Sequence, residues 1–287
     1  MDNTGTYLLN FKGCNCLCSF ANVDYLEHLH DFEIRDDNVF IIAYPKSGKF
    51  EELATCFCLH YSPPTSGKAP SPSHQEPHNK PLYQLKPKGS RHQKFVKIVS
   101  LLSLKIIYIY RNPKDVLISY FHFSNWLLTL EPSHDIKHFM EKFLDGRVFG
   151  SLWFDHIRGW YEHRHDFNIL FMMYEEMKKV GGLSVLKISS FLEKELSEED
   201  LDAVVKQAAF ENMKLDLQAN YDHIIKLKMK PRTKDGHFLR TVGDWKNHLT
   251  VAQNERFDRI FQKKMKDFPF KFIRDTDEEY NQCQRVI

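Results

Sequence analysis

The stretch VFIIAYPKSG, residues 39–48, decides the fold class. Its first five residues form a continuous apolar run rich in β-branched side chains, typical of a buried strand, and its last five form a tight loop. A lysine and several backbone amides directly after a buried strand form a cradle for phosphate or sulfate. Lys46, Ser47 and Gly48 are therefore predicted to bind an anion, and the competing interpretation is a plain surface turn.

This loop does not fit a Walker phosphate-binding loop. That motif, GxxxxGK[ST], needs an earlier glycine and a serine or threonine after its lysine. Here Gly48 and Lys49 are followed by Phe50. The sequence therefore disfavours a P-loop kinase. Only an observation of ATP-dependent phosphate transfer would support that hypothesis.

Two further apolar runs, residues 106–110 and 169–173, have the same strand signature. The first ends at Arg111, and Pro113 is well placed as the first-turn residue of a helix. The second ends at Tyr174 and precedes another helical stretch. Strands that alternate with helices predict a single α/β domain with a central parallel sheet flanked by helices, and ligands at the carboxyl ends of the strands.

Arg111 and Ser119 are candidates for a second phosphate contact. Arg111 stands at the end of the second strand, and Ser119 lies roughly two helical turns further along the chain. An arginine fork and a hydroxyl can share one phosphate. The competing interpretation is an exposed charge and a serine on the surface of a helix.

Composition narrows the class of protein. Of the 287 residues, 42% are hydrophobic and 27% are charged, which is typical of a globular chain, and the net charge of +2 argues against general attraction to nucleic acid. We find no apolar run of about 18 residues for a membrane span and no secretory signal pattern. The six cysteines lack the CxxC spacing of a zinc site. We therefore expect a cytoplasmic protein without metal, nucleic acid or membrane partners.

Three segments, in this order, resemble the cytosolic sulfotransferase family. They are YPKSG at 44–48, KIIYIYRNPKDVLISYFHF at 105–123 and GDWKNH at 243–248. Within the family, residues 112–125 and 150–167 are most similar to the amine sulfotransferases. The resemblance implies that residues 1–287 form one sulfotransferase domain with PAPS (3′-phosphoadenylyl sulfate) as sulfate donor, and with a divergent, irregular segment at about 49–104.

The resemblance also implies roles for single residues. The loop of Lys46, Ser47 and Gly48 would hold the 5′-phosphosulfate of PAPS, and Lys46 would stabilise the charge on the leaving phosphate. The remaining nucleotide contacts implied by the family pattern are Arg111 and Ser119 at the 3′-phosphate, Tyr174 in the nucleotide site, and Phe210 near the adenine. Without the resemblance, Tyr174 and Phe210 are interpreted as core aromatics.

The chain departs from the family pattern at the nucleotide site. After the loop the family has a threonine and, two residues later, a tryptophan that stacks on adenine, whereas this chain has Lys49, Phe50 and Glu51. Stacking of a base is worth about 1–3 kcal/mol in single-stranded nucleic-acid sites, so weaker donor binding is expected. At the 3′-phosphate the family has an Arg-Lys-Gly motif, and this chain keeps only its arginine, Arg240. Arg240 is therefore a candidate ligand of the 3′-phosphate, displaced from the family's position.

A further departure concerns the general base. The acceptor must lose a proton as it attacks sulfur, and a histidine is suited to take that proton near neutral pH. Lys80 stands at the position of the family's histidine, and His78 lies two residues earlier. His78 is therefore the candidate base.

Residues 246–255 match the family's dimer motif, KxxxTVxxxE, at every defined position. The match implies a homodimer through Lys246 to Glu255. The competing interpretation is an ordinary helix start, in which Thr250 is the N-cap.

Two functions remain open at this point. An active enzyme would move a sulfuryl group from PAPS to an amine, or to the hydroxyl of a phenol or alcohol, on a small acceptor. A catalytically impaired homologue would bind the nucleotide weakly or act as a dimer partner. The departures after Gly48 and at Lys80 favour the second function.

Overall fold

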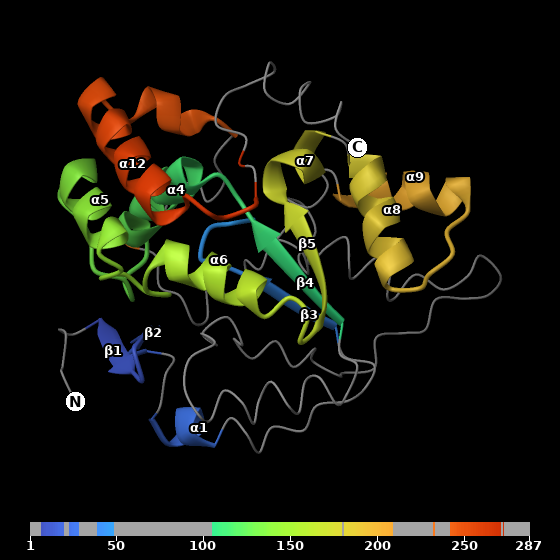
Figure 1. Ribbon diagram of the computed structural model, residues 1–287, viewed down its shortest axis with the longest axis horizontal. Coiled ribbons are helices and arrows are strands. Elements are labelled where there is room, and N and C mark those ends of the chain that lie inside the picture. Colours follow the sequence, from blue (N-terminus) through green and yellow to red (C-terminus); the bar gives the residue numbers. More distant parts are fainter. Residues whose placement is uncertain are drawn as a thin grey trace.

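The computed structural model describes residues 7–19, 23–28, 39–48, 105–179, 181–208, 232, 242–270 and 272. At its centre lies a parallel sheet of β3 (Val39–Ala43), β4 (Lys105–Tyr110) and β5 (Asn168–Met173), in that order (Figure 1). The register pairs Ala43 with Ile109, and Ile109 with Met172, so the three carboxyl ends lie at one edge. The predicted α/β class and its three strands are confirmed.

β4 is buried on both faces because it is the middle strand. Ile106 and Tyr108 belong to one hydrophobic core, whereas Ile107 and Ile109 belong to the other. This division follows from the alternation of side chains along a strand. A continuous apolar run was therefore the correct sequence signal for this strand.

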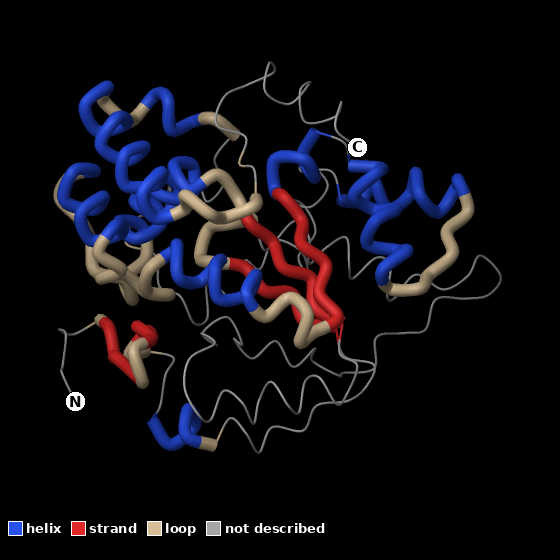
Figure 2. Tube along the Cα trace, in the orientation of Figure 1, coloured by secondary structure: helices blue, strands red, loops and turns tan. Residues whose placement is uncertain are grey.

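Helices cover both faces of the sheet (Figure 2). The core on the Tyr108 side includes residues of α4 (Pro113–Trp126), α5 (Ile136–Leu144), α6 (Trp153–Glu162) and α12 (Val251–Lys264). The core on the Ile107 side includes residues of α7 (Tyr174–Lys179), α8 (Gly181–Phe191) and α9 (Glu198–Ala208). The sheet is thus held between two layers of helices.

The amino-terminal residues form a hairpin of β1 (Leu8–Phe11) and β2 (Cys14–Leu17), followed by α1 (Val23–Glu27). Lys12 and Gly13 in the turn have φ of 51° and 80°, as a two-residue hairpin turn requires. The backbone N–H of Asn15 donates to the Ser151 hydroxyl at 2.8 Å and joins the hairpin to the rest of the molecule. Among the helices described here, none combines the length and the apolar character needed to cross a bilayer.

The start of α4 follows the sequence prediction. Asn112 is the N-cap, and its side-chain oxygen accepts a hydrogen bond of 2.9 Å from the backbone N–H of Lys114. Pro113 occupies the first turn, where its missing N–H costs nothing. The short helix η2 (Asp244–Asn247) lies beside α4 and precedes α12. α4 therefore begins directly after Arg111, at the carboxyl edge of the sheet.

Candidate active site

The carboxyl ends of the three parallel strands bring three predicted site residues together. Lys46 lies in the loop after β3, Arg111 follows β4, and Tyr174 follows β5. Arg111 contacts both of the others, because its Nη1 donates to the Lys46 carbonyl oxygen at 3.4 Å and its guanidinium lies 4.5 Å from the centre of the Tyr174 ring. The carboxyl edge of the sheet is therefore the candidate site.

The loop after β3 has an unusual backbone. Lys46 and Gly48 have φ of 69° and 106°, and the backbone N–H of Ser47 donates to the Tyr44 carbonyl oxygen at 3.0 Å. A lysine with positive φ is uncommon, and such conformations gather at functional sites. The Lys46 amine lies 4.6 Å from the centre of the Phe123 ring, so it is directed toward α4.

Ser47 carries the clearest sign of a ligand contact. Its side chain is fully buried, and its hydroxyl has no hydrogen-bond partner within the described part of the chain. A buried polar atom without a partner costs free energy, so such an atom in a native fold calls for an explanation. An oxygen of a bound anion would satisfy this hydroxyl.

Arg111 places a permanent positive charge at the same edge. The residue is 3% exposed, and an arginine remains protonated when it is buried. The ring of Tyr174 stabilises the guanidinium through a cation–π contact. Ser119 is buried on α4, and the interpretation of these two residues as surface groups is therefore wrong.

Two buried carboxylates that the sequence did not single out interact electrostatically with Arg111. Glu175 accepts a hydrogen bond of 2.9 Å from the backbone N–H of Asn112. Burial raises the pKa of Glu175 to about 7, although that hydrogen bond and the charge of Arg111 both lower it. Burial also raises the pKa of Asp115, which accepts hydrogen bonds from the backbone of Gly243 and Trp245. In the sequence, Glu175 is next to Tyr174, and Asp115 follows Arg111 by four residues. These positions were the only signals that could have indicated the two carboxylates.

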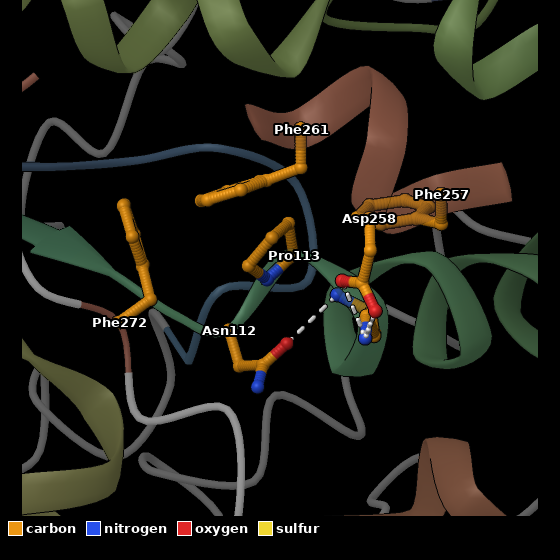
Figure 3. Close-up of a pocket in the computed structure, with 7 residues that line it drawn as sticks. Asn112, Pro113, Phe257, Asp258, Phe261 and Phe272 are labelled. Carbon is orange, nitrogen blue, oxygen red and sulfur yellow. Dashed lines mark hydrogen bonds and ion pairs between the residues drawn. The ribbon is translucent and has the colours of Figure 1, made fainter. Parts of the chain in front are cut away.

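A small pocket lies between the start of α4 and α12 (Figure 3). The space enclosed by its lining residues, open solvent included, is about 210 Å³, so the pocket is shallow. The residues that line it are Asn112, Pro113, Lys114, Phe257, Asp258, Phe261 and Phe272. The set includes neither Lys46 nor Arg111, so this pocket is separate from the candidate site.

The rest of the predicted site lies outside the described residues. This applies to the candidate base His78, to Phe210 and Arg240, and to the divergent residues 49–51. Their roles remain predictions.

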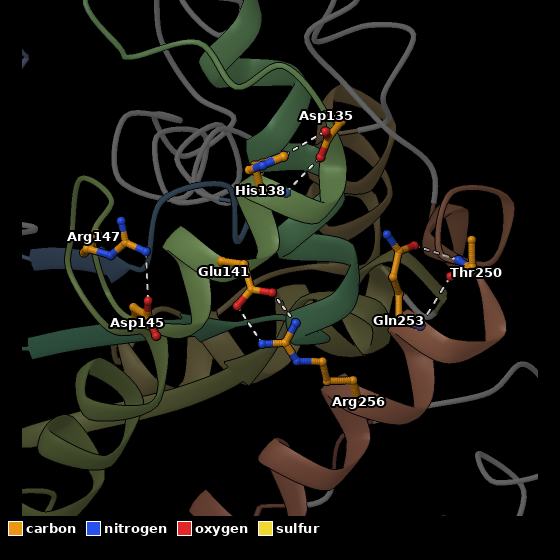
Figure 4. Close-up of polar contacts among 8 residues, drawn as sticks. All are labelled: Asp135, His138, Glu141, Asp145, Arg147, Thr250, Gln253 and Arg256. Atoms are coloured by element: carbon orange, nitrogen blue, oxygen red, sulfur yellow. Dashed lines mark hydrogen bonds and ion pairs between the residues drawn. The ribbon is translucent and has the colours of Figure 1, made fainter.

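The predicted dimer segment is described, and it contains a complete helix cap (Figure 4). The Thr250 side chain accepts from the Gln253 backbone at 3.3 Å, and the Gln253 side chain accepts from the Thr250 backbone at 2.9 Å. Arg256 forms a two-pronged ion pair with Glu141 of α5. The cap explains Thr250, but it does not explain why Val251 is 75% exposed.

Comparisons with known proteins agree with this fold. The model of the sulfotransferase domain family matches residues 36–269. The chain is 53% identical to the amine sulfotransferase of Oryctolagus cuniculus, over 98% of each chain, and 37% identical to sulfotransferase 2A1 of Homo sapiens, over 83% of this chain and 88% of that one. The crystal structure of mouse sulfotransferase SULT7A1 complexed with PAP superposes with a TM-score of 0.69 at 27% identity, over 98% and 99% of the two chains.

This chain belongs to the sulfotransferase family. The sequence resemblance to that family, and within it to the amine sulfotransferases, is confirmed.

Proposed function

We propose that this protein transfers a sulfuryl group from PAPS to an amine or a hydroxyl of a small acceptor. The observation that carries the proposal is the contact between Arg111 and the backbone of Lys46, which unites two predicted anion-binding segments at one edge of the sheet. The solved relative SULT7A1 is complexed with PAP, the nucleotide that remains after PAPS gives up its sulfuryl group, and this supports PAPS as the donor.

The residues present fit such a donor. Lys46, Ser47 and Gly48 would hold the 5′-phosphosulfate, and the buried Ser47 hydroxyl would gain the partner that it lacks within the described residues. Arg111 and Ser119, with Arg240, would hold the 3′-phosphate, and Tyr174 and Phe210 would contact the nucleotide. PAPS supplies an activated sulfuryl group when bound.

The chemistry left to the protein is charge stabilisation and proton removal. The ammonium of Lys46 stabilises the negative charge that develops on the phosphate oxygen as its bond to sulfur breaks. His78 takes the proton from the acceptor amine or hydroxyl. Transfer of labelled sulfate from PAPS to a panel of amines and phenols tests the function, and ATP serves as the control donor for a kinase.

A catalytically impaired homologue is the second candidate. It is favoured by Lys49, Phe50 and Glu51 after the loop and by Lys80 at the position of the family's histidine. Such a protein would bind PAP and transfer no sulfate to any acceptor.

We further propose that the chain acts as a single domain and forms a homodimer through Lys246 to Glu255. The exposed Val251, within the full match to the KxxxTVxxxE pattern, supports an interface there. An apolar side chain that is three-quarters exposed gains free energy when a second chain covers it.

A further inference from the structure

The turn that carries Lys46 has a conformation that a lysine does not favour. The backbone N–H of Ser47 donates to the Tyr44 carbonyl oxygen at 3.0 Å, which closes a turn with Pro45 in its second position. Lys46, the third residue of the turn, has φ of 69°. A turn with positive φ at this position usually has glycine there, and a strained residue persists only where its surroundings hold it. The turn therefore depends on contacts from outside the loop.

Residues 149–151, here called the support segment, contact the first two residues of this turn. The buried Tyr44 donates its hydroxyl to the Ser151 carbonyl oxygen at 2.7 Å. Gly150 has φ of 84°, and a Cβ built on it would lie 3.0 Å from both Cγ and Cδ of Pro45. Since carbon atoms in contact lie about 3.5–4.0 Å apart, no side chain fits between Gly150 and the Pro45 ring.

The support segment is itself held by two further elements. The backbone N–H of Gly150 donates to the Asn15 carbonyl oxygen of β2 at 3.0 Å, and the Ser151 hydroxyl accepts from the Asn15 backbone at 2.8 Å. From α4, the Tyr120 hydroxyl donates to the Phe149 carbonyl oxygen at 2.9 Å. Because these hydrogen bonds fix the support segment, a side chain added at position 150 would displace the turn instead.

Pro45 would pass such a displacement on to Lys46. The proline ring is closed on the backbone nitrogen, so it cannot rotate away as a flexible side chain would. A shift of the ring moves the peptide group that joins Pro45 to Lys46 and, beyond it, the buried Ser47. The conformation of the loop therefore depends on the absence of a side chain at position 150.

We propose that Gly150 is a positioning residue for the 5′-phosphosulfate of the donor. Its bare backbone leaves room for the Pro45 ring, and the Tyr44 hydroxyl ties the start of the turn to the same segment. Together these contacts keep Lys46 and Ser47 in the conformation that binds the anion. This inference rests on the proposed function, because it takes the loop as the site of the 5′-phosphosulfate.

The test measures the dissociation constants of PAP and of adenosine 3′-monophosphate, which lacks the 5′-phosphate, by calorimetry for the full chain and its variants. Gly150→Ala should reduce the preference for PAP by about tenfold, the lower end of what loss of one hydrogen bond to a charged group costs. A variant that is merely less stable binds both nucleotides with an unchanged ratio once it is folded. An unchanged preference in folded Gly150→Ala would therefore overturn the proposal.

Removal of the proline ring provides the control. Pro45→Ala lacks the Cγ and Cδ atoms that an added Cβ at position 150 would meet, and by itself it should keep the preference within about threefold, because alanine can adopt the same backbone conformation. In this background, Gly150→Ala should change the preference by less than about twofold, whereas independent effects would add. A tenfold loss in both backgrounds would mean that the contact with Pro45 is not responsible and would overturn the proposal.

A second variant covers the case in which Gly150→Ala does not fold. Tyr44→Phe keeps the ring and removes the hydroxyl that donates to the Ser151 carbonyl oxygen. It should lower the preference for PAP by about fivefold, the value of one neutral hydrogen bond, and an unchanged preference would overturn the proposal. If Lys46→Ala loses the preference while Gly150→Ala keeps it, only this inference fails. If the unmodified chain does not prefer PAP to adenosine 3′-monophosphate, the proposed function fails with it.

Discussion

The guanidinium of Arg111 donates a hydrogen bond of 3.4 Å to the backbone carbonyl oxygen of Lys46. The two residues are 65 positions apart in the chain, and the parallel pairing of β3 with β4 brings them together. The site therefore has two cationic side chains on adjacent strand ends, which suits a ligand with two anionic groups.

Arg111→Ala should weaken PAP binding by about 10- to 100-fold, because hydrogen bonds to a charged group contribute about 1.5–3 kcal/mol. AMP binding should weaken much less, because AMP has no 3′-phosphate for the guanidinium to contact and loses only the support that Arg111 gives to the Lys46 loop. Calorimetry with both nucleotides measures the two effects. An equal loss for PAP and AMP would place Arg111 away from the 3′-phosphate.

Glu175→Gln should remove a pH dependence of folding stability. Burial raises the pKa of Glu175 from its ordinary 4.5 to about 7, so between these values the unfolded chain ionises the group while the folded chain keeps it protonated. Glu175 therefore lowers stability as the pH rises from about 4.5 to about 7, by about 3 kcal/mol in total.

Urea unfolding at pH 5 and pH 8 measures this effect. The stability gained from Glu175→Gln should be about 2 kcal/mol larger at pH 8 than at pH 5, because most of the pKa difference lies between these values. The glutamine oxygen can still accept from the Asn112 backbone, so that hydrogen bond is kept. A gain that is the same at both pH values would show that the pKa of Glu175 is not raised.

His78→Ala should abolish turnover and leave PAP affinity within about threefold, since a general base acts in the chemical step. Steady-state rates and calorimetry on the same preparation give both values. Lys80→Ala, two residues away, is the comparison variant. If turnover is unchanged in His78→Ala, another group takes the proton, and loss of turnover in Lys80→Ala would indicate Lys80.

Val251→Glu should convert a homodimer to a monomer, because the proposed interface would have to bury a charge without a partner. Leu183→Glu on α8 is the matched control, since Leu183 is also apolar and 53% exposed, and it lies outside the dimer motif. Sedimentation velocity distinguishes the two states. A chain that is already monomeric before substitution would refute the dimer.

Much of the fold was predictable from local patterns. The three apolar runs gave the strands because buried parallel strands need no polar alternation, and Pro113 gave the start of α4. Thr250 was correctly interpreted as a cap, although its partner in the capping box is Gln253. Residue spacing predicted these elements because each depends on neighbours in the chain.

The supporting carboxylates were not predictable in the same way. Glu175 meets Asn112, and Asp115 meets Gly243, only after strands and helices have packed. The residue types did not indicate that these side chains are buried, because most acidic side chains in proteins are exposed to solvent. Their burial and their backbone partners are properties of the tertiary structure.

The most direct test of the central claim is transfer of labelled sulfate from PAPS to a panel of small amines and phenols, with the unmodified chain and with Lys46→Ala. We expect the unmodified chain to label at least one acceptor, and Lys46→Ala to be slower by at least about a hundredfold, because loss of one charge-stabilising donor typically costs that much. Lys105→Ala, at the amino end of β4 and paired with Glu193, is the control and should keep its rate. No transfer to any acceptor by a chain that still binds PAP would contradict the account, and so would transfer that is indifferent to Lys46→Ala.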